Sequence, residues 1–282
     1  MQNLAYYNGK YAPIDEMTVP FNDRVHFFGD GVYDVTYTRN HIPFALDEHI
    51  DRFYNSAALL DIHIPCTKAA LADTIREMVR KVDDGDQFLY IQATRGTQMR
   101  QHTYPEDLMA NLWIMIKPQQ VKDIYTPVRA ITAEDTRFFH CNIKTLNLLP
   151  SVMYAQQAER AGVFETILYR KPDRVTECAH ANVHIINQNG IFQTAPTDHL
   201  ILPGIARAHL IKACKALGIG VDEHPFTLAE LMNAREVMIS SSGAFGLHCV
   251  EIDGKPVGGK DPEKLKAIQD YVLDEFLTAT NP

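Results

Sequence analysis

The sequence has no run of about 18 apolar residues, the length that an ordinary membrane-spanning helix needs. Its first residues also lack the basic start and the apolar stretch that characterise a secretory signal. These two absences exclude an ordinary membrane span and favour a soluble, cytoplasmic protein.

Cysteine is scarce, and basic residues are not in excess. The five cysteines are odd in number and widely scattered, which is unlike a disulfide framework, so we expect reduced thiols. None of them forms a CxxC motif, so a zinc site is not favoured. The formal net charge of -8 argues against nucleic acid as a partner, because binding to phosphate backbones depends on concentrated Lys and Arg. Small molecules are the expected partners.

The composition is that of a globular protein: 46% of the residues are hydrophobic and 22% are charged. A chain of 282 residues is long enough for two domains. A polar run at 117–123 contains no core residues, and we place the boundary there. The predicted organisation is an N-terminal α/β domain at 1–118, a linker at 119–124 and a C-terminal domain at 125–282.

The N-terminal domain is expected to begin with strands. Asn8-Gly9 is the two-residue signal of a hairpin turn. The segment 32–37 is rich in β-branched and aromatic residues and predicts a strand in which Tyr33, Val35 and Tyr37 share one face. Further strands are expected at 88–94 and 112–116.

Two helices are expected between these strands. Asp47 is a candidate N-cap for a helix whose apolar residues recur at three- and four-residue spacing up to position 60, with Arg52 beside the apolar stripe. A second helix is expected after Thr67. The C-terminal domain has strand-like segments at 128–132, 165–169, 183–186 and 237–240, a hairpin turn at 253–254, and helices after Pro150, after Gly204 and around 265–276. Blocks of strands with few helices predict an α+β fold with a larger, barrel-like second domain.

Lys144 stands among apolar neighbours in the segment 141–149. Lysine is rarely buried without a partner or a function. One interpretation is a desolvated amine that forms a Schiff base with a carbonyl compound. The alternative is a surface lysine whose stem covers hydrophobic side chains.

Two stretches of the second domain contain candidate ligand-binding groups. Glu177 enters a strand-rich segment, where a carboxylate can pair with a protonated ring nitrogen of a cofactor or can be an edge-strand charge. Gly204 precedes a helix whose first N–H groups are able to bind a phosphate, although many such helices bind nothing. The run 240–243 can add hydroxyl donors to that anion or can be a simple loop.

A basic loop follows the strand at 88–94. Arg100 and His102 are two positions apart and can point together at one carboxylate, with the arginine giving a bidentate contact. The alternative is an ordinary basic loop.

Taken together, these stretches resemble the class IV, or fold-type IV, pyridoxal-phosphate transaminases, and most closely the bacterial D-amino-acid (D-alanine) aminotransferases. The resemblance covers nearly the whole chain. It rests on seven motifs in the order of that family: Phe28-Gly29-Asp30-Gly31-Val32-Tyr33, Glu48-His49-Ile50-Asp51-Arg52, Thr94-Arg95-Gly96-Thr97, Asp135-Thr136-Arg137, Asn142-Ile143-Lys144-Thr145-Leu146-Asn147, Thr176-Glu177 with Asn182-Val183, and Ile201-Leu202-Pro203-Gly204-Ile205.

The resemblance implies a two-domain fold with pyridoxal 5'-phosphate as the cofactor. Lys144 matches the lysine that binds the cofactor covalently and then moves the α-proton of the substrate. Glu177 matches the carboxylate at the pyridine nitrogen. The positions that match the phosphate-binding groups are Arg52, the backbone of Ile205 and Ala206, and Ser242.

The resemblance also implies the substrates, which are D-amino acids and 2-oxo acids, with D-alanine and 2-oxoglutarate as the preferred pair. Tyr33, Arg100 and His102 match the group that binds the α-carboxylate. Val35, Tyr37 and Ser241 match the lining of the side-chain pocket. A homodimer is implied as well, because in related enzymes the loop that carries the Arg-x-His pair reaches the active site of the neighbouring subunit.

Two departures from the family pattern affect the expectations. Ala206 stands where relatives often have threonine, which removes a hydroxyl from the phosphate site, and the segment 178–181 replaces a serine-rich run. Other activities on the same scaffold are a branched-chain L-aminotransferase, an (R)-amine transaminase and an aminodeoxychorismate lyase. A non-catalytic cofactor-binding protein is the alternative from another class.

Overall fold

Asn8 and Gly9 form the turn of the first β-hairpin, with φ angles of 44° and 89°. Positive φ at both central residues is the conformation of a type I′ turn, which Asn-Gly favours. The turn joins β1 (Leu4–Tyr7) to β2 (Lys10–Ala12), as the sequence predicts. These elements belong to a computed structural model that describes residues 1–282.

The hairpin forms one edge of a six-stranded sheet in the order β2-β1-β6-β5-β3-β4, in which neighbouring strands are antiparallel. The other strands of this sheet are β3 (Gly31–Arg39), β4 (Ile42–Pro43), β5 (Gln87–Thr94) and β6 (Asn111–Pro118). The three strands predicted at 32–37, 88–94 and 112–116 are therefore present, each slightly longer than predicted.

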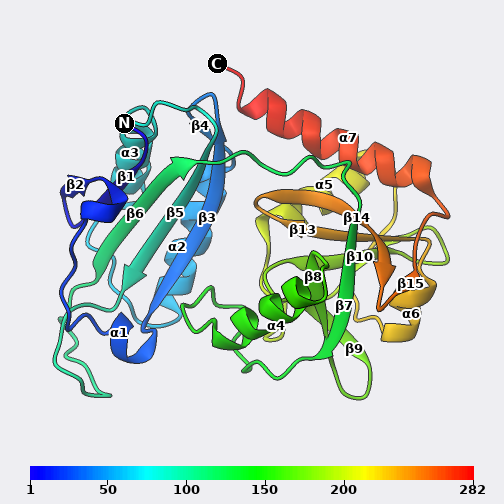
Figure 1. Ribbon diagram of the computed structural model, residues 1–282, viewed down its shortest axis with the longest axis horizontal. Helices are drawn as coiled ribbons and strands as arrows, with labels where there is room; N and C mark the ends of the chain where they lie inside the picture. The colour runs from blue at the N-terminus through cyan, green and yellow to red at the C-terminus, as the bar shows by residue number, and fades with distance from the viewer. The chain divides into compact units, whose positions relative to one another are not determined.

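Two helices, α2 (Leu46–Ala58) and α3 (Lys68–Val79), pack on the same face of this sheet (Figure 1). The hydroxyl of Thr67 accepts a hydrogen bond from the backbone N–H of Ala70 and caps α3. The predicted cap of α2 is wrong: the N-cap is Ala45, in a left-handed conformation, and Asp47 lies in the first turn. A carboxylate there still interacts favourably with the positive end of the helix dipole. Two short helices lie between β2 and β3 in the chain: the 3-10 helix η1 (Ile14–Glu16) and α1 (Val25–Phe28).

The chain divides into two compact units, and the first contains two segments from far along the sequence. Unit 1 comprises Met1–Val121, Ile143–Asn147 and Phe276–Pro282, and unit 2 comprises Lys122–Asn142 and Leu148–Glu275. The predicted second domain, 125–282, includes these two segments, whereas unit 2 excludes them and begins at Lys122. Backbone hydrogen bonds explain why Ile143–Asn147 belongs to unit 1. Tyr33 N–H donates to Lys144 O at 3.0 Å, and Leu146 N–H donates to Gly31 O at 3.0 Å.

Unit 2 is built on a nine-stranded sheet in the order β12-β11-β10-β13-β14-β7-β8-β9, with β15 paired to β14, and the sheet curls into a half-barrel (Figure 1). Most pairs are antiparallel, but β7 lies parallel to both β14 and β8, and β11 lies parallel to β12. The strands are β7 (Val128–Glu134), β8 (Glu165–Arg170), β9 (Arg174–Cys178), β10 (Asn182–Ile186), β11 (Phe192–Thr194), β12 (Val221–Asp222), β13 (Glu236–Ser241), β14 (Ala244–Ile252) and β15 (Lys255–Pro256).

Four helices belong to the second half of the chain: α4 (Leu149–Arg160), α5 (Ile205–Ala216), α6 (Leu228–Asn233) and α7 (Pro262–Ala279). Helix α4 packs on β7 and β8, and α5 packs on β13 and β14. The sequence predicts α4, α5 and α7 but not α6, which begins with a capping box formed by Thr227 and Glu230. The predicted α+β architecture, with a smaller first domain and a larger barrel-like second domain, is confirmed. None of the helices is long and apolar enough to cross a membrane.

Candidate active site

Lys144 lies in the segment of unit 1 that extends along the start of β3. Its side chain is half-buried, and its Nζ atom lies 4.4 Å from the centre of the Tyr33 ring. The backbone N–H of Lys144 donates to Ser56 Oγ at 3.2 Å, so helix α2 also positions this residue. The backbone of Lys144 is therefore held by a backbone bond to β3 and by the Ser56 hydroxyl of α2, its amine lies against an aromatic ring, and it is not an exposed surface lysine.

Gly31 allows this segment to approach the sheet. A Cβ atom at this position would lie 2.6 Å from Ala93 O and 2.7 Å from Leu146 Cδ1, distances that real contacts do not show. The glycine of the motif 28–33 is thus required by the close packing of the lysine segment on β3.

Arg52 lies on α2 and binds a carboxylate on the buried face of β3. Its Nε donates to Asp34 Oδ2 at 2.8 Å and its Nη2 donates to Asp34 Oδ1 at 2.7 Å, and His49 Nδ1 lies 2.7 Å from the same oxygen. Despite its burial, the pKa of Asp34 is lowered, because Arg52 and His49 favour the charged carboxylate. Burial lowers the pKa of His49, and the positive charges of Arg52 and Lys144 act in the same direction. These contacts hold the Arg52 side chain in one orientation.

Tyr33, Val35 and Tyr37 share one face of β3, as predicted, and it is the face opposite Asp34. Tyr33 stacks on Tyr90 of β5 with ring centres 5.6 Å apart. The hydroxyl of Tyr37 accepts a hydrogen bond from Gln119 Nε2 at 3.0 Å. Tyr33 and Val35 are only partly buried.

Arg100 and His102 are exposed, and both contact the ring of Phe28, the last residue of α1. The Arg100 guanidinium lies 5.3 Å from the centre of that ring, and the His102 ring centre lies 5.2 Å from it. The structure thus brings the two predicted carboxylate-binding residues together on one aromatic side chain.

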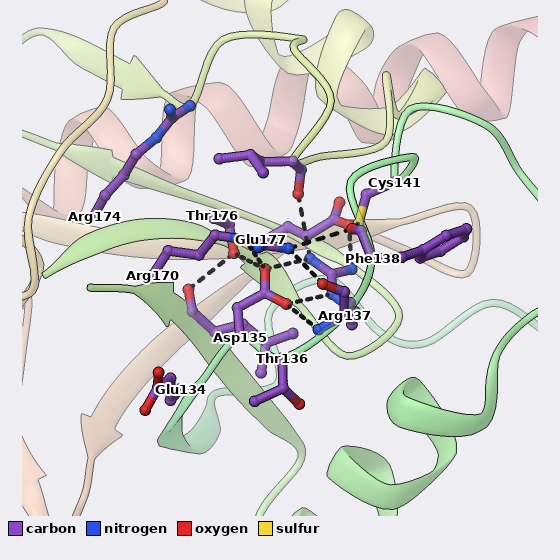
Figure 2. A network of polar contacts seen from close by, with 12 residues as sticks. Glu134, Asp135, Thr136, Arg137, Phe138, Cys141, Arg170, Arg174, Thr176 and Glu177 are labelled. Atoms are coloured by element: carbon purple, nitrogen blue, oxygen red, sulfur yellow. Dashed lines mark hydrogen bonds and ion pairs between the residues drawn. The ribbon is translucent and has the colours of Figure 1, made fainter. Parts of the chain in front are cut away.

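In unit 2, Glu177 is the buried end of a charged network (Figure 2). Its Oε1 accepts a hydrogen bond from Arg137 Nη1 at 2.5 Å, and its Oε2 accepts from Asn182 Nδ2 at 3.0 Å and from Leu202 N at 2.9 Å. Arg137 also binds Asp135 through its Nε and Nη2 atoms, each at 3.0 Å. Glu177, Asn182, Arg137 and Asp135 are each less than one-tenth exposed.

Burial and ion pairing have opposite effects on the pKa values of Glu177 and Arg137. Complete burial raises the pKa of Glu177, and the Arg137 guanidinium opposes that rise. Pairing with Glu177 and Asp135 outweighs desolvation at Arg137 and raises its pKa. Because Arg137 stays protonated and three donors surround the carboxylate, we expect Glu177 to be ionised at neutral pH.

Helix α5 begins at Ile205 with no side-chain cap and no acidic residue in its first turn. The first N–H groups of a helix have no partner within the helix, so those of Ile205 and Ala206 suit an anion. Gly204 is the N-cap, and a Cβ atom there would lie 2.1 Å from Asn182 Oδ1. This close approach links the helix start to Asn182, which binds Glu177.

Ser241 ends β13 and Ser242 follows it in the turn to β14, and both are partly exposed. The preceding residue, Ser240, is buried and bonds to His184 Nε2 at 2.8 Å. Two hydroxyl groups are therefore available at the end of a strand that also contacts α5.

Comparison with known proteins adds to this geometry. Residues 31–252 match the family described as amino-transferase class IV. The chain is 39% identical to the D-alanine aminotransferase of Bacillus licheniformis over 277 residues, which cover 97% of each chain. It is 36% identical to the D-alanine aminotransferase of Listeria monocytogenes serotype 1/2a, with 96% of each chain covered.

The chain belongs to the class IV aminotransferases.

Solved structures show the same fold. The branched-chain aminotransferase of Thermoproteus uzoniensis superposes with a TM-score of 0.87 and 24% identity, covering 98% of this aminotransferase and 97% of that chain. The branched-chain amino acid aminotransferase of Escherichia coli gives a TM-score of 0.89 and 23% identity, covering 100% and 96%. At this level of identity the similarity shows fold type IV and nothing finer.

Some functional contacts of this aminotransferase were not assigned from the sequence. The sequence identifies Asp135 and Arg137 only as part of a motif, without a role. Their D-x-R spacing indicates that the two side chains can meet, because alternate residues of an extended segment point the same way. Asp34 was missed too, and the signal was an acidic residue on the buried face of a strand. Ala206 is buried in the first turn of α5, so its backbone N–H is the group that remains for an anion.

Proposed function

We propose that this aminotransferase is a D-amino-acid transaminase that uses pyridoxal 5'-phosphate to transfer the amino group of a D-amino acid, preferably D-alanine, to a 2-oxo acid, preferably 2-oxoglutarate. The supporting observation is that Arg100 and His102 lie together on Phe28, in a chain related over nearly its full length to D-alanine aminotransferases. Paired basic side chains suit the α-carboxylate that amino and oxo acids share.

The residues present fit the cofactor. We assign Lys144 as the amine that binds it covalently and Glu177 as the carboxylate at its ring nitrogen. We assign its phosphate to Arg52, to the backbone N–H groups of Ile205 and Ala206, and to Ser242. The donor set supports this assignment, because a packed lysine, an ionised buried carboxylate and an uncapped helix start match an aldehyde, a protonated pyridine and a phosphate.

When bound, pyridoxal phosphate supplies an electron-withdrawing ring that stabilises negative charge at the substrate α-carbon. Glu177, held ionised by Arg137, keeps a positive charge on the ring nitrogen. Lys144 Nζ would accept the α-proton of the amino donor and pass it on within the first half-reaction, and in the second half-reaction it would deliver a proton to the α-carbon of the oxo acid. Lys144 is packed against Tyr33. Its amine would therefore reach the substrate α-carbon from one side only, and this would set the configuration of the amino acid formed.

The substrate is bound by a second group of residues in this proposal. Tyr33, Arg100 and His102 bind the α-carboxylate, and Val35, Tyr37 and Ser241 line the pocket for the side chain. Tyr33 lies against Lys144, which places one carboxylate ligand beside the amine that moves the proton. Arg100 is able to give the bidentate contact.

We also propose that the protein is a cytoplasmic homodimer in which the loop of Arg100 and His102 reaches the site of the neighbouring subunit. Exposed large apolar side chains support an interface. Phe21 is 88% exposed and Met99 is 76% exposed in unit 1, and Leu149 is 73% exposed in unit 2. Burial of these side chains against another chain would remove their apolar surface from water.

A single-turnover experiment tests the proposed function. Protein loaded with pyridoxal phosphate is mixed with D-alanine or with L-alanine in the absence of an oxo acid, and the pyruvate formed per subunit is measured. We expect about one pyruvate per subunit from D-alanine and almost none from L-alanine, since the first half-reaction is stoichiometric. Faster release from L-alanine would favour the branched-chain type of reaction.

Two lysine variants provide the controls for this experiment. Lys144→Ala removes the assigned amine and should slow the half-reaction by at least about 1,000-fold, the scale expected of a group that combines covalent and proton-transfer roles. Lys68→Ala changes an exposed lysine of the same unit that pairs with Asp51 on the surface, and it should turn over at the wild-type rate. An unchanged rate for Lys144→Ala would rule out the mechanism.

A further inference from the structure

Arg24 is a buried arginine that binds the backbone of the loop carrying Arg100 and His102. Its Nη1 donates to the carbonyl oxygens of Gln101 at 2.6 Å and Thr103 at 3.4 Å, and its Nη2 donates to that of His102 at 3.2 Å. One guanidinium therefore binds three successive carbonyl groups. Arg24 is 3% exposed, whereas residues 99–104 of the loop are exposed.

The Arg24 side chain is itself anchored to the body of unit 1. Its Nε donates to Asp30 Oδ2 at 2.8 Å, and the same carboxylate accepts from Arg95 Nε at 3.0 Å. The Arg95 guanidinium lies 3.8 Å from the centre of the Tyr104 ring, so it also contacts the last residue of the loop. Arg24, Asp30 and Arg95 thus connect the segment before β3 and the end of β5 to the loop.

Arg24 also shares an aromatic neighbour with the two candidate substrate ligands. Its guanidinium lies 5.0 Å from the centre of the Phe28 ring, the ring that Arg100 and His102 contact. Arg24 thus binds the backbone of the loop and also contacts the Phe28 ring, against which the side chains of Arg100 and His102 pack.

The loop has no regular secondary structure between β5 and β6 apart from one isolated bridge at Thr97. Ordering such a segment costs conformational entropy that its own exposed side chains do not offset. A planar guanidinium has five donors in a fixed fork, so it can bind several carbonyls at once, which a lysine ammonium cannot match geometrically.

We infer that Arg24 is a positioning residue that fixes loop 98–104 in the conformation in which Arg100 and His102 bind the substrate α-carboxylate. This inference rests on the proposed function, since it takes the loop to be the carboxylate site. Arg24 does not touch the substrate in this account, and its effect passes through the loop and Phe28.

The test measures steady-state kinetics with D-alanine for Arg24→Ala, Arg24→Lys, Arg100→Ala and the double variant Arg24→Ala/Arg100→Ala. Arg24→Ala should raise KM at least about 10-fold with kcat within about 3-fold of wild type, the signature of lost binding in both ground and transition states. Arg24→Lys keeps the charge but loses the fork, so it should raise KM as well. In the Arg100→Ala background, Arg24→Ala should add less than about 2-fold, because coupled residues are not additive.

A readout without catalysis accompanies the kinetics. The rate of tryptic cleavage after Arg100, followed by mass spectrometry, should rise at least about 10-fold in Arg24→Ala, because proteolysis follows the population of the opened loop. Arg76→Ala, at an exposed arginine of α3, is the matched control and should cleave and turn over like wild type. Arg24→Lys keeps the test informative if Arg24→Ala folds poorly.

The outcomes separate this inference from the proposed function. If wild type consumes D-alanine and Arg100→Ala raises KM, but both Arg24 variants leave KM within about 2-fold of wild type, the inference is overturned and the proposed function stands. The same holds if the two substitutions raise KM additively, which indicates a general structural role. If wild type does not consume D-alanine at all, the proposed function fails and the inference fails with it.

Discussion

Glu177 is buried and accepts hydrogen bonds from three donors, and its negative charge is the property that the proposed reaction uses. Glu177→Gln keeps the size of the side chain but removes the charge opposite the ring nitrogen. We expect kcat/KM to fall about 10- to 100-fold, which corresponds to about 1.5–3 kcal/mol for a hydrogen bond to a charged group. Glu77→Gln, on the exposed face of α3, is the control and should have no effect. A Glu177→Gln enzyme with wild-type kcat/KM would contradict the assignment.

His184 is a second buried titratable residue, and it affects stability. It lies between Thr194 Oγ1 at 2.9 Å and Ser240 Oγ at 2.8 Å, and burial lowers its pKa from 6.5 to about 3. Between these values the unfolded chain binds a proton that the folded chain does not, so this residue destabilises the fold as the pH falls below 6.5. At pH 5 the loss is about 2 kcal/mol.

His184→Gln should therefore reduce the loss of unfolding free energy between pH 7.5 and pH 5 by about 2 kcal/mol, measured by urea denaturation at both pH values. The glutamine amide retains one donor and one acceptor for the two hydroxyl groups. His63→Gln, at an exposed histidine, serves as the control. An equal loss in His184→Gln and wild type would show that His184 is not the buried neutral group described.

At the scale of single residues, the sequence indicates which polar side chains are unusual but not which of them meet. Lys144 is identifiable because it stands among apolar neighbours, and Glu177 because it is a carboxylate that enters a strand-rich segment. The Arg137–Glu177 contact joins residues 40 positions apart, and no local pattern encodes it. The same is true of Asp34 and Arg52, which are 18 positions apart on a strand and a helix.

Among the elements, the start of α5 is the one on which the phosphate assignment depends. In Gly204→Ala, the new Cβ would lie 2.1 Å from Asn182 Oδ1, so the Asn182 side chain must move and its bonds to Glu177 and Leu202 O are lost. We expect the dissociation constant for pyridoxal phosphate to rise at least about 10-fold, since charge-assisted contacts are lost with it. Equilibrium dialysis or absorbance titration measures this constant.

Gly220→Ala is the matched control for the glycine substitution. Its Cβ would meet Ile191 Cγ1 at 3.4 Å, an ordinary contact, and Gly220 follows the end of the same helix. Cofactor affinity should stay within about 2-fold of wild type, because no charged contact is disturbed. Equal losses of affinity in the two variants would indicate a general effect on α5 rather than a role for its first turn.

The regular elements are predictable where a local signal is strong. Asn8-Gly9 and the alternation along β3 predict a hairpin and a strand that the structure contains. The cap of α2 was misassigned because the left-handed Ala45 starts the helix without a side-chain bond. The segment Ile143–Asn147 pairs with β3, more than 100 positions earlier in the chain, and only tertiary contacts, such as Leu146 N–H with Gly31 O, determine this.

For the whole molecule, the proposed homodimer predicts a solution mass of about twice the 31.9 kDa of one chain. If the loop of Arg100 acts in the neighbouring site, a heterodimer of Lys144→Ala and Arg100→Ala subunits contains one site with both residues intact. Co-purified heterodimer should then recover up to about half of the wild-type activity, although each parent homodimer is impaired. If the loop serves its own subunit, no site in the heterodimer is intact and no activity returns.

The most direct test of the central claim is the configuration of the amino acid formed when the cofactor-loaded enzyme is given D-alanine and 2-oxoglutarate. Derivatisation with a chiral reagent and chromatography separates the two enantiomers of glutamate. The account predicts D-glutamate, formed in proportion to pyruvate, because Lys144 delivers the proton from one side while Arg100 and His102 hold the carboxylate. L-Glutamate, or no glutamate at all, would contradict it.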